Sequence, residues 1–189
     1  MMPAGVRHAC VAQRSVRASR GHERGSVTHV VVLADTHIRR GSSRRLSDAV
    51  RVQLERADLI LHAGDLLVPE LLEELSGFAP VHAVLGNNDH ELVGCLPEQL
   101  VLDIDGVRVA MVHDSGARAG RAGRLRRRFP DAAVVVFGHS HVPADELGID
   151  GQRLFNPGSP TERRGQPHHT LGRLGLVDGR LAVHEIHVV

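Results

Sequence analysis

Several residue types that mark common classes of binding protein are scarce or missing from this chain. It has no Trp, no Tyr and no Lys, and only four Phe among 189 residues. Base stacking on single-stranded nucleic acid would therefore have to rely on Phe and Arg. The net charge of +1 gives no reason to expect nucleic acid or an acidic membrane as a partner. No apolar stretch approaches the roughly 20 residues that a transmembrane helix needs.

Cysteine is nearly absent as well. Cys10 and Cys95 lie far apart in the chain and form no CxxC pair. This pattern favours two free thiols in a reducing compartment, so we expect a cytoplasmic protein.

The start of the chain differs in composition from the rest. Residues 1–26 contain five Arg and a single acid, and they show neither a helical nor a strand period. Such a leader resembles a transit peptide in composition, but a disordered tail, or a start codon placed too far upstream, is the favoured interpretation. We expect a disordered Arg-rich N-terminal extension over 1–26 and one folded domain over 27–189.

Apolar runs alternate with helical periods in the first half of the domain. Strands are expected at 28–34, 58–62 and 81–85, with helices at 44–56 and 69–78 between them. This alternation is typical of βαβ units that build a parallel sheet.

The second half favours strands joined by tight turns. Three Asp-Gly pairs predict two-residue hairpin turns at 105–106, 150–151 and 178–179. Further strands are expected at 100–104, 107–112, 132–137, 171–177 and 181–188. A helix is expected at 118–129, although two Gly weaken its propensity. We predict one α/β domain with two sheets and helices outside, its second half mostly antiparallel.

Five short polar clusters each follow an apolar run. They are Asp35-Thr36-His37, Gly64-Asp65, Gly86-Asn87-Asn88-Asp89, His113-Asp114 and Gly138-His139-Ser140-His141. Open α/β sheets place their ligands at the carboxyl ends of strands, and in extended backbone Asp35 and His37 would face the same side. His, Asp and Asn without thiolate suit Mn²⁺, Fe, Zn²⁺, Co²⁺ or Ni²⁺. Seven ligands are too many for one metal but fit two, with the central Asp65 as the expected bridge.

In this order and spacing, the clusters resemble the calcineurin-like metallophosphoesterases, whose pattern is D-x-H, G-D, G-N-x-[DE], a His and G-H-x-H. The short chain and the segment Asn156-Pro157-Gly158-Ser159 are similar to the small single-domain YfcE-like phosphodiesterase branch. The resemblance runs from about residue 28 to the C-terminus. It implies a four-layer αββα sandwich of two mixed sheets flanked by helices, with the site at one edge.

The resemblance also implies a role for each matching position. One metal ion would be held by Asp35, His37 and His141, a second by Asn87, His113 and His139, and both by the bridging Asp65. The two divalent ions would be Mn²⁺ in the first place, with Ni²⁺, Fe, Zn²⁺, Co²⁺ or Mg²⁺ as alternatives. A hydroxide bridging them would attack phosphorus. We count Asp65, Asn87 and His139 as catalytic.

Two positions depart from the family pattern. Asn88 stands where larger members have a His that protonates the leaving group, so activated aryl diesters are expected to react best. Ser115 replaces the second His of an H-G-H segment, and Asp114 either orients His113 or caps a turn. Residues expected to contact substrate or support the ligands are Thr36, Asn88, Asp89, His90, Asp114 and Asn156. The remaining histidines, His62 among them, are expected in structural or surface positions.

The sequence thus predicts a hydrolase acting on ester bonds, a binuclear-metal phosphodiesterase or phosphatase with a small phosphodiester as substrate. A second hypothesis is a protein-binding scaffold, because the retromer scaffold subunit resembles the same branch, although all seven ligand positions are intact here. A nuclease is the third, because some relatives cut nucleic acids, although the chain has no evident strand-binding domain. The physiological substrate, the native metal and the formation of a homo-oligomer stay open.

Overall fold

The computed structural model describes residues 25–189, so the expected extension 1–26 lies almost wholly outside the described residues. The first sheet contains, in spatial order, β10 (Arg180–Val188), β9 (Thr170–Val177), β1 (Thr28–Leu33), β2 (Leu59–His62) and β3 (Val81–Ala83). The second contains β4 (Gln99–Ile104), β5 (Val107–Val112), β6 (Val134–Val136), β8 (Arg153–Asn156) and β7 (Ala144–Leu147). The helices are α2 (Asp48–Leu54), α3 (Pro69–Ser76) and α4 (Arg121–Arg128), with short 3₁₀ helices η1 (His90–Leu92) and η2 (Ile149–Gly151).

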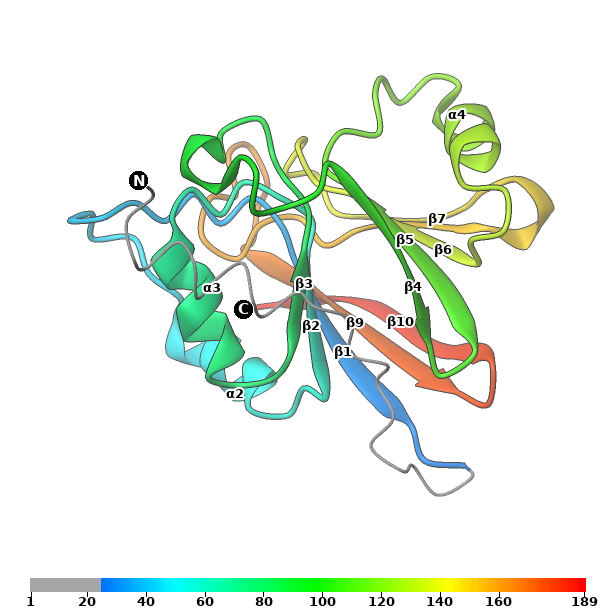
Figure 1. Ribbon diagram of the computed structural model, residues 1–189, viewed down its shortest axis with the longest axis horizontal. Coiled ribbons are helices and arrows are strands. Elements are labelled where there is room, and N and C mark those ends of the chain that lie inside the picture. The colour runs from blue at the N-terminus through cyan, green and yellow to red at the C-terminus, as the bar shows by residue number, and fades with distance from the viewer. Residues whose placement is uncertain (1–24) are drawn as a thin grey trace.

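The two sheets pack face to face, and helices cover their outer faces. Helices α2 and α3 lie together against the first sheet, and α4 lies against the second sheet on the other side of the molecule (Figure 1). Three separate hydrophobic clusters correspond to these layers: one under α2 and α3, one between the sheets and one under α4. The expected four-layer αββα sandwich is confirmed.

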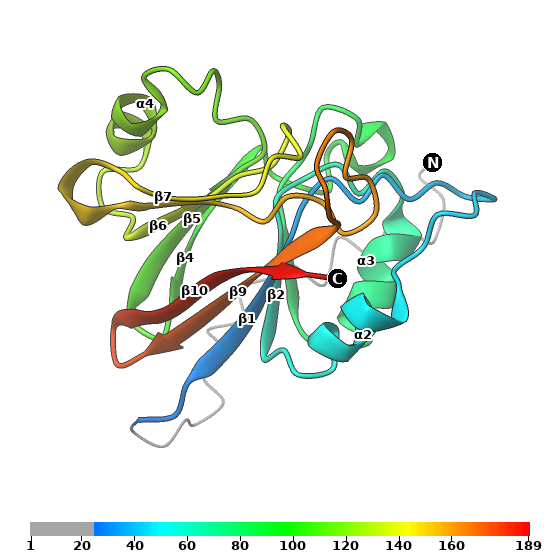
Figure 2. The same ribbon diagram turned by 180° about the vertical axis from the view of Figure 1, so that it is seen from behind.

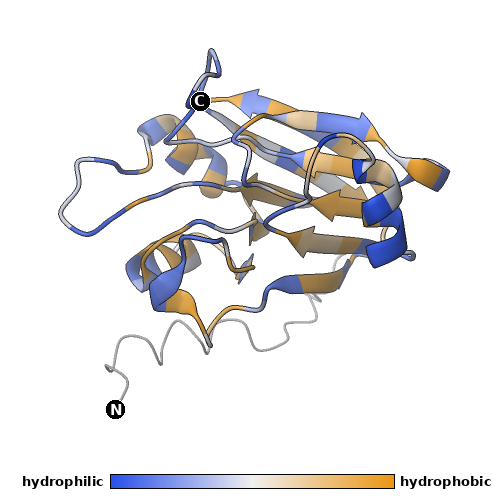
Figure 3. Ribbon diagram, turned by 90° about the horizontal axis from the view of Figure 1, so that it is seen from above, coloured by the Kyte–Doolittle hydropathy of each residue, from blue (hydrophilic) through white to orange (hydrophobic). Residues whose placement is uncertain are grey.

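Strand β1 shows why the sequence has continuous apolar runs. Val31 and Leu33 pack in the cluster under α2 and α3, whereas Val30 and Val32 pack between the two sheets. A strand buried on both faces needs an apolar side chain at every position rather than at alternate ones. Seen from above, the strands inside the molecule are accordingly mostly hydrophobic, and hydrophilic residues gather in the loops (Figure 3).

Both sheets are mixed. Strands β1, β2 and β3 run parallel, as the βαβ pattern predicts. Strand β9 pairs antiparallel with β1, and β10 at the edge pairs antiparallel with β9 (Figure 2). In the second sheet β5, β6 and β8 run parallel, and the edge strands β4 and β7 are antiparallel to their neighbours. The second half is thus mostly antiparallel, as expected, except for two pairings that involve β6. The carboxyl ends of the parallel strands of each sheet therefore lie together at one edge.

The helices are shorter than the sequence patterns predict. The helix expected at 44–56 begins at Asp48, because the Ser47 side chain accepts a hydrogen bond from Val50 N at 3.3 Å and caps it. Helix α4 begins after Gly120, which has a left-handed backbone with φ of 70°. No helix within residues 25–189 is long and apolar enough to span a membrane.

The expected hairpins are present. Asp105, Asp150 and Asp178 have positive φ angles of 50°, 53° and 46°. Each precedes a Gly that also has a positive φ. The pairs 105–106 and 178–179 form two-residue turns, as predicted. Asp150-Gly151 instead lies in a five-residue connection over 148–152 that contains η2, because the last pair of β7 and β8 is Leu147 with Arg153.

One expectation about cysteine is wrong. Cys95 is disulfide-bonded rather than free. Cys10 lies outside the described residues.

Candidate metal centre

The polar clusters follow the parallel strands of both sheets and meet at one edge. Asp35 follows β1, Asp65 follows β2, and His139 follows β6 of the second sheet. The two sheets touch there, because the carboxylate oxygen Oδ1 of Asp35 accepts a hydrogen bond from the backbone N of His139 at 3.1 Å. The prediction that these clusters converge at strand ends is confirmed.

Three side chains form a first group. The Nε2 atoms of His37 and His141 lie 3.2 Å apart, and their rings stack with centroids 5.1 Å apart. Asp35 Oδ1 lies 3.6 Å from His141 Nε2. One potential ligand atom from each of these three buried residues falls within 4.8 Å of the others, so together they could hold a metal ion.

A second group lies beside the first. Asn87 Oδ1 lies 3.1 Å from His113 Nε2 and 3.0 Å from His139 Nδ1. Asp65 Oδ2 lies 3.5 Å from His113 Nε2 and 3.4 Å from His37 Nε2. A single oxygen of Asp65 therefore lies between one imidazole of each group.

Backbone carbonyls determine which nitrogen of two of these histidines carries the proton. His113 Nδ1 lies 2.7 Å from the carbonyl oxygen of Ala63, and His141 Nδ1 lies 2.5 Å from that of Glu162. A carbonyl oxygen only accepts hydrogen bonds, so each Nδ1 must donate one. When such a ring is neutral, its Nε2 carries a lone pair directed into the site, as in most metal-binding histidines.

The backbone at the candidate ligands is unusual. Asp35, His37, Asp65, His139 and His141 all have positive φ angles, between 46° and 68°. Residues other than Gly rarely adopt this left-handed region, and strain of this kind clusters at functional sites. The expectation that Asp35 and His37 share a face through extended backbone is therefore wrong. Backbone hydrogen bonds from Asp35 N to Gly64 O at 3.0 Å and from His37 N to Asp65 O at 2.9 Å hold the turn instead.

The two carboxylates differ in how readily they ionise. Burial, with the neighbouring Asp65, raises the pKa of Asp35 to about 8. Burial would raise the pKa of Asp65 too, but the His113 ring and hydrogen bonds from Asn88 outweigh it and leave that pKa below its usual value. Asp35 Oδ2 is buried and finds no hydrogen-bond partner among residues 25–189. A buried acceptor of this kind needs a cation or a proton. Burial also lowers the pKa of His37 and His141, which favours the neutral form of both rings.

Glycine is required in two of the motifs because the loops pack against each other. A Cβ on Gly86 would lie 2.1 Å from Asp65 Oδ1 and 2.2 Å from Asp65 N. A Cβ on Gly64 would lie 2.6 Å from His113 Nδ1. The glycines therefore allow the loops after β2 and β3 to bring their polar side chains into contact.

The residues expected to support the ligands divide into two kinds. Asp89 is buried, and its carboxylate accepts hydrogen bonds from the backbone N atoms of Asp65, Gly86 and Leu67 at 2.9, 2.7 and 2.8 Å. Asn88 donates from Nδ2 to Asp65 Oδ2 at 2.7 Å. Both residues hold the Asp65 loop in place.

Thr36 and Asn156 are fully buried beneath the ligands rather than at the surface. Asn156 donates to Gly138 O at 2.9 Å and so fixes the loop that carries His139 and His141. Asp114 is exposed and accepts from Gly116 N at 2.7 Å, so it caps a turn. His90 is exposed and lines a pocket next to Asn88.

Sequence reasoning missed several neighbours of the site. His62 is fully buried, lies 3.1 Å from Thr36 Oγ1 through Nε2, and has its pKa lowered to about 3 by burial and by the nearby His113. Ser159 donates to Asp35 O at 2.7 Å. Arg164 adds positive charge that favours the ionised form of Asp35. Only Ser159 had a signal in the sequence, since it ends the Asn-Pro-Gly-Ser segment.

Comparison with known proteins identifies relatives of this chain. The model of the calcineurin-like phosphoesterase superfamily domain matches residues 29–179. A probable metallophosphoesterase of Methanothermobacter thermautotrophicus is 36% identical over 135 residues, which cover 70% of this chain and 77% of that protein.

Solved structures share the fold. Vacuolar protein sorting 29 of Cryptosporidium parvum has a TM-score of 0.69 at 20% identity, over 86% of this chain and 99% of its own. A protein described as a novel archaeal phosphodiesterase has a TM-score of 0.64 at 19% identity, over 85% of this chain and 99% of its own. These two likenesses show a common fold. The family model and the relative from Methanothermobacter thermautotrophicus also show the family. The chain belongs to the calcineurin-like phosphoesterase superfamily.

Proposed function

We propose that this protein is a metal-dependent phosphodiesterase that hydrolyses a small phosphodiester at a binuclear metal site. The observation that carries the proposal is the position of Asp65 Oδ2, 3.4 Å from His37 Nε2 and 3.5 Å from His113 Nε2. A carboxylate oxygen between one imidazole of each group is the arrangement expected of a ligand shared by two cations.

The residues present fit two divalent ions. Asp35, His37 and His141 would hold one ion, Asn87, His113 and His139 the other, and Asp65 both. The unpartnered oxygen of Asp35 and the inward lone pairs of His113 and His141 support this assignment. Nitrogen and oxygen donors without thiolate favour Mn²⁺, with Ni²⁺, Fe, Zn²⁺, Co²⁺ and Mg²⁺ as alternatives. When bound, two such ions activate water and neutralise charge on phosphoryl oxygens.

The chain's own residues favour substrates with good leaving groups. Asn88 uses its amide N–H to hold Asp65, and an amide does not act as a general acid at neutral pH. Without a proton donor at this position, the leaving oxygen departs as an anion, and the rate then depends strongly on its stability. An activated aryl diester such as bis(4-nitrophenyl) phosphate is therefore the substrate of choice for a first assay.

Two other functions remain in competition. The fold likeness to vacuolar protein sorting 29 favours a protein-binding scaffold as the second candidate. The intact donor set argues for catalysis instead, and the fold likeness to an archaeal phosphodiesterase supports a diester as substrate. A nuclease ranks third, and a cleavage assay on single- and double-stranded DNA tests it.

The test is turnover of bis(4-nitrophenyl) phosphate by chelator-stripped protein titrated with Mn²⁺, Mg²⁺, Ni²⁺ and Zn²⁺. We expect metal-restored hydrolysis that falls more than about a hundredfold in Asp65→Ala. Asp131→Ala is the control, because Asp131 is exposed and precedes β6, at the opposite end of that strand from His139. If two ions bind per chain but no metal supports turnover, the phosphodiesterase proposal is rejected and the protein-binding scaffold is favoured.

A further inference from the structure

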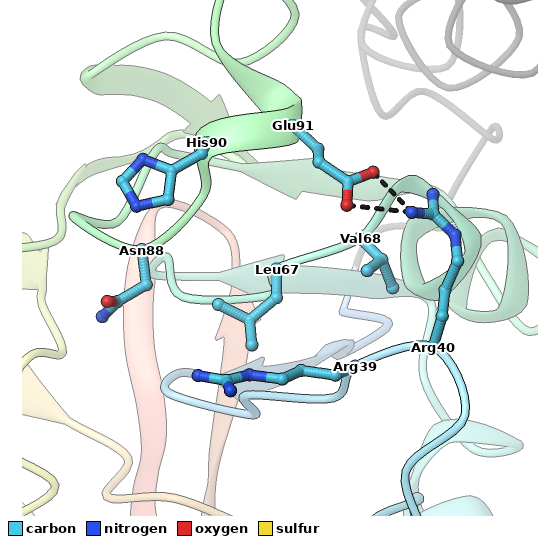
Figure 4. Close-up of a pocket in the computed structure, with 7 residues that line it drawn as sticks. All are labelled: Arg39, Arg40, Leu67, Val68, Asn88, His90 and Glu91. Atoms are coloured by element: carbon cyan, nitrogen blue, oxygen red, sulfur yellow. Dashed lines mark hydrogen bonds and ion pairs between the residues drawn. The ribbon is translucent and has the colours of Figure 1, made fainter.

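A pocket of about 400 Å³ opens beside the candidate metal centre. Its lining includes Arg39, Leu67, Asn88 and His90 (Figure 4). Asn88 joins the pocket to the metal centre, because its side chain donates to Asp65 Oδ2 at 2.7 Å. A volume of this size suits part of a small-molecule substrate.

The two arginines of this pocket are in different electrostatic states. Arg40 is neutralised by two carboxylates, with contacts of 2.7 and 2.9 Å to Glu70 and of 2.8 and 2.7 Å to Glu91. The side chain of Arg39 makes no hydrogen bond or ion pair with any residue in the range 25–189, and only its backbone carbonyl is bonded, to Ser42 N at 3.2 Å. Figure 4 shows Arg40 turned to Glu91, whereas the Arg39 guanidinium extends beneath Leu67 toward the side of the pocket where Asn88 lies.

Arg39 also lines a second pocket, of about 410 Å³, whose wall includes the candidate ligand His37. The other arginine of that pocket, Arg44, is committed to Glu162 at 2.5 Å and to the carbonyl oxygen of His37 at 3.2 Å. Arg39 therefore lines both pockets next to the metal centre, and its side chain has no carboxylate partner within the described part of the chain. An exposed guanidinium held near a phosphoryl site presents a planar fork of donors suited to an oxyanion.

We propose that Arg39 binds a second anionic group of the substrate, a phosphate or carboxylate, in the pocket beside Asn88 and His90. This inference rests on the proposed phosphodiesterase function and narrows its substrate class to diesters that carry a further oxyanion. The scissile phosphoryl group lies at the metal centre, and the additional anion lies against Arg39, with the imidazole of His90 as a further polar neighbour.

A matched pair of substrates tests the proposal. The 4-nitrophenyl ester of thymidine 5′-phosphate and the same ester carrying a 3′-phosphate differ only by one oxyanion, and both release 4-nitrophenolate. With Mn²⁺-loaded protein we expect the 3′-phosphorylated ester to have a kcat/KM about tenfold higher. Arg39→Ala should bring the ratio of the two kcat/KM values to about one. The control Arg45→Ala removes another exposed arginine that lines neither pocket, and it should leave the ratio as in the wild type.

Equilibrium binding gives a readout that does not depend on turnover. By calorimetry, the Mn²⁺-loaded protein should bind thymidine 3′,5′-bisphosphate about tenfold more tightly than thymidine 5′-monophosphate, and Arg39→Ala should abolish the difference. Turnover of both esters with a ratio near one, or a ratio unchanged in Arg39→Ala, would overturn the inference while leaving the phosphodiesterase intact. If neither ester shows metal-dependent turnover but the difference in binding is still present, the phosphodiesterase proposal is rejected and the anion site at Arg39 is supported.

Discussion

At the scale of single residues, Asp35 is the group of the site whose ionised form is least favoured by its surroundings. It is buried next to a second carboxylate, one of its oxygens lacks a partner within the described residues, and its pKa is raised to about 8. Asp65, by contrast, is stabilised as an anion by His113 and Asn88. In the absence of a cation, Asp35 therefore keeps its proton over most of the physiological pH range, and a cation must displace that proton.

This gives a prediction about stability and pH. Asp35 has a folded-state pKa of about 8 and an ordinary value of 3.8, so its contribution to stability is complete below about pH 4 and is lost as the pH rises through 8. Between pH 4 and pH 8, the Tm of the metal-free wild-type protein should thus show a decrease that the Tm of Asp35→Asn does not show. The added stability from Mn²⁺ should grow over the same range in the wild type. Thermal unfolding at a series of pH values measures both, and parallel curves for the two proteins would contradict the assignment.

Residue types and their places in the sequence were enough to predict the candidate ligands, because chemistry restricts which side chains bind metals. They were not enough to predict the support around them. His62 sits in an apolar strand and looks like any core histidine, and its contact with Thr36 exists only in three dimensions. Arg39 is one of many arginines, and only the fold shows that it lacks the carboxylate partners of Arg40.

At the scale of elements, the loops after β2 and β3 behave as one unit. The Asp89 carboxylate accepts hydrogen bonds from Asp65 N and Gly86 N, and so joins the two loops. Gly86 lies so close to Asp65 that a side chain would have to occupy the space of the carboxylate and of its backbone N. The position of Asp65 is therefore set by the loop after β3 as much as by its own strand.

Substitution at Gly86 should disturb both stability and metal binding. Gly86→Ala places a Cβ 2.2 Å from Asp65 N, a backbone atom that cannot swing away. We expect a loss of about 2 kcal/mol in the free energy of unfolding and a Mn²⁺ affinity reduced about tenfold or more. Chemical denaturation and metal titration measure these effects.

Gly165→Ala is the matched control, since a Cβ there would meet no atom within 4 Å. It should change the free energy of unfolding by less than about 0.5 kcal/mol. Wild-type stability and metal affinity in Gly86→Ala would show that the loops are looser than described.

Patterns predicted element types better than element ends. Helix α2 begins at Asp48 because Ser47 caps it. Arg44, before the helix, donates a hydrogen bond to Glu162. The helical period of the sequence continues through both residues, so periodicity alone could not place the boundary. The turn around Asp35 and His37 was missed for a related reason: a positive φ at a residue other than Gly is set by tertiary contacts.

At the scale of the whole molecule, the spacing of the two sheets depends on a glycine. Gly172 in β9 faces Phe155 of the other sheet, and a Cβ at this position would lie 2.3 Å from Phe155 Cε1 and 3.1 Å from Val32 Cβ. Phe155 is fully buried between the sheets, so its ring has little freedom to move.

A double-mutant cycle tests this contact. Gly172→Ala should lower the free energy of unfolding by about 1–3 kcal/mol through overpacking. Phe155→Leu should destabilise as well, but the double variant should be more stable than the sum predicts, by at least about 0.5 kcal/mol, because the smaller side chain makes room. Additive effects in chemical denaturation would mean that the two residues do not compete for space.

The pairing of the strands is the part of the fold that patterns could not supply. Strand β9, near the end of the chain, inserts between β1 and β10, and β6 pairs in parallel with both β5 and β8. Buried strands with apolar residues on both faces carry little information about register or partner. The two-sheet architecture was predictable because the five motifs resemble those of a known family, and the comparison of structures confirms it.

The central claim is that Asp65 joins two divalent ions held by the ends of the strands. Electron paramagnetic resonance of Mn²⁺-titrated protein tests it most directly, because two Mn²⁺ ions that share a carboxylate are magnetically coupled. The account predicts saturation at two Mn²⁺ per chain with a coupled spectrum, which Asp65→Asn loses and Asp131→Asn keeps. Saturation at a single ion, or two ions with the spectrum of isolated Mn²⁺ in the wild type, would contradict it.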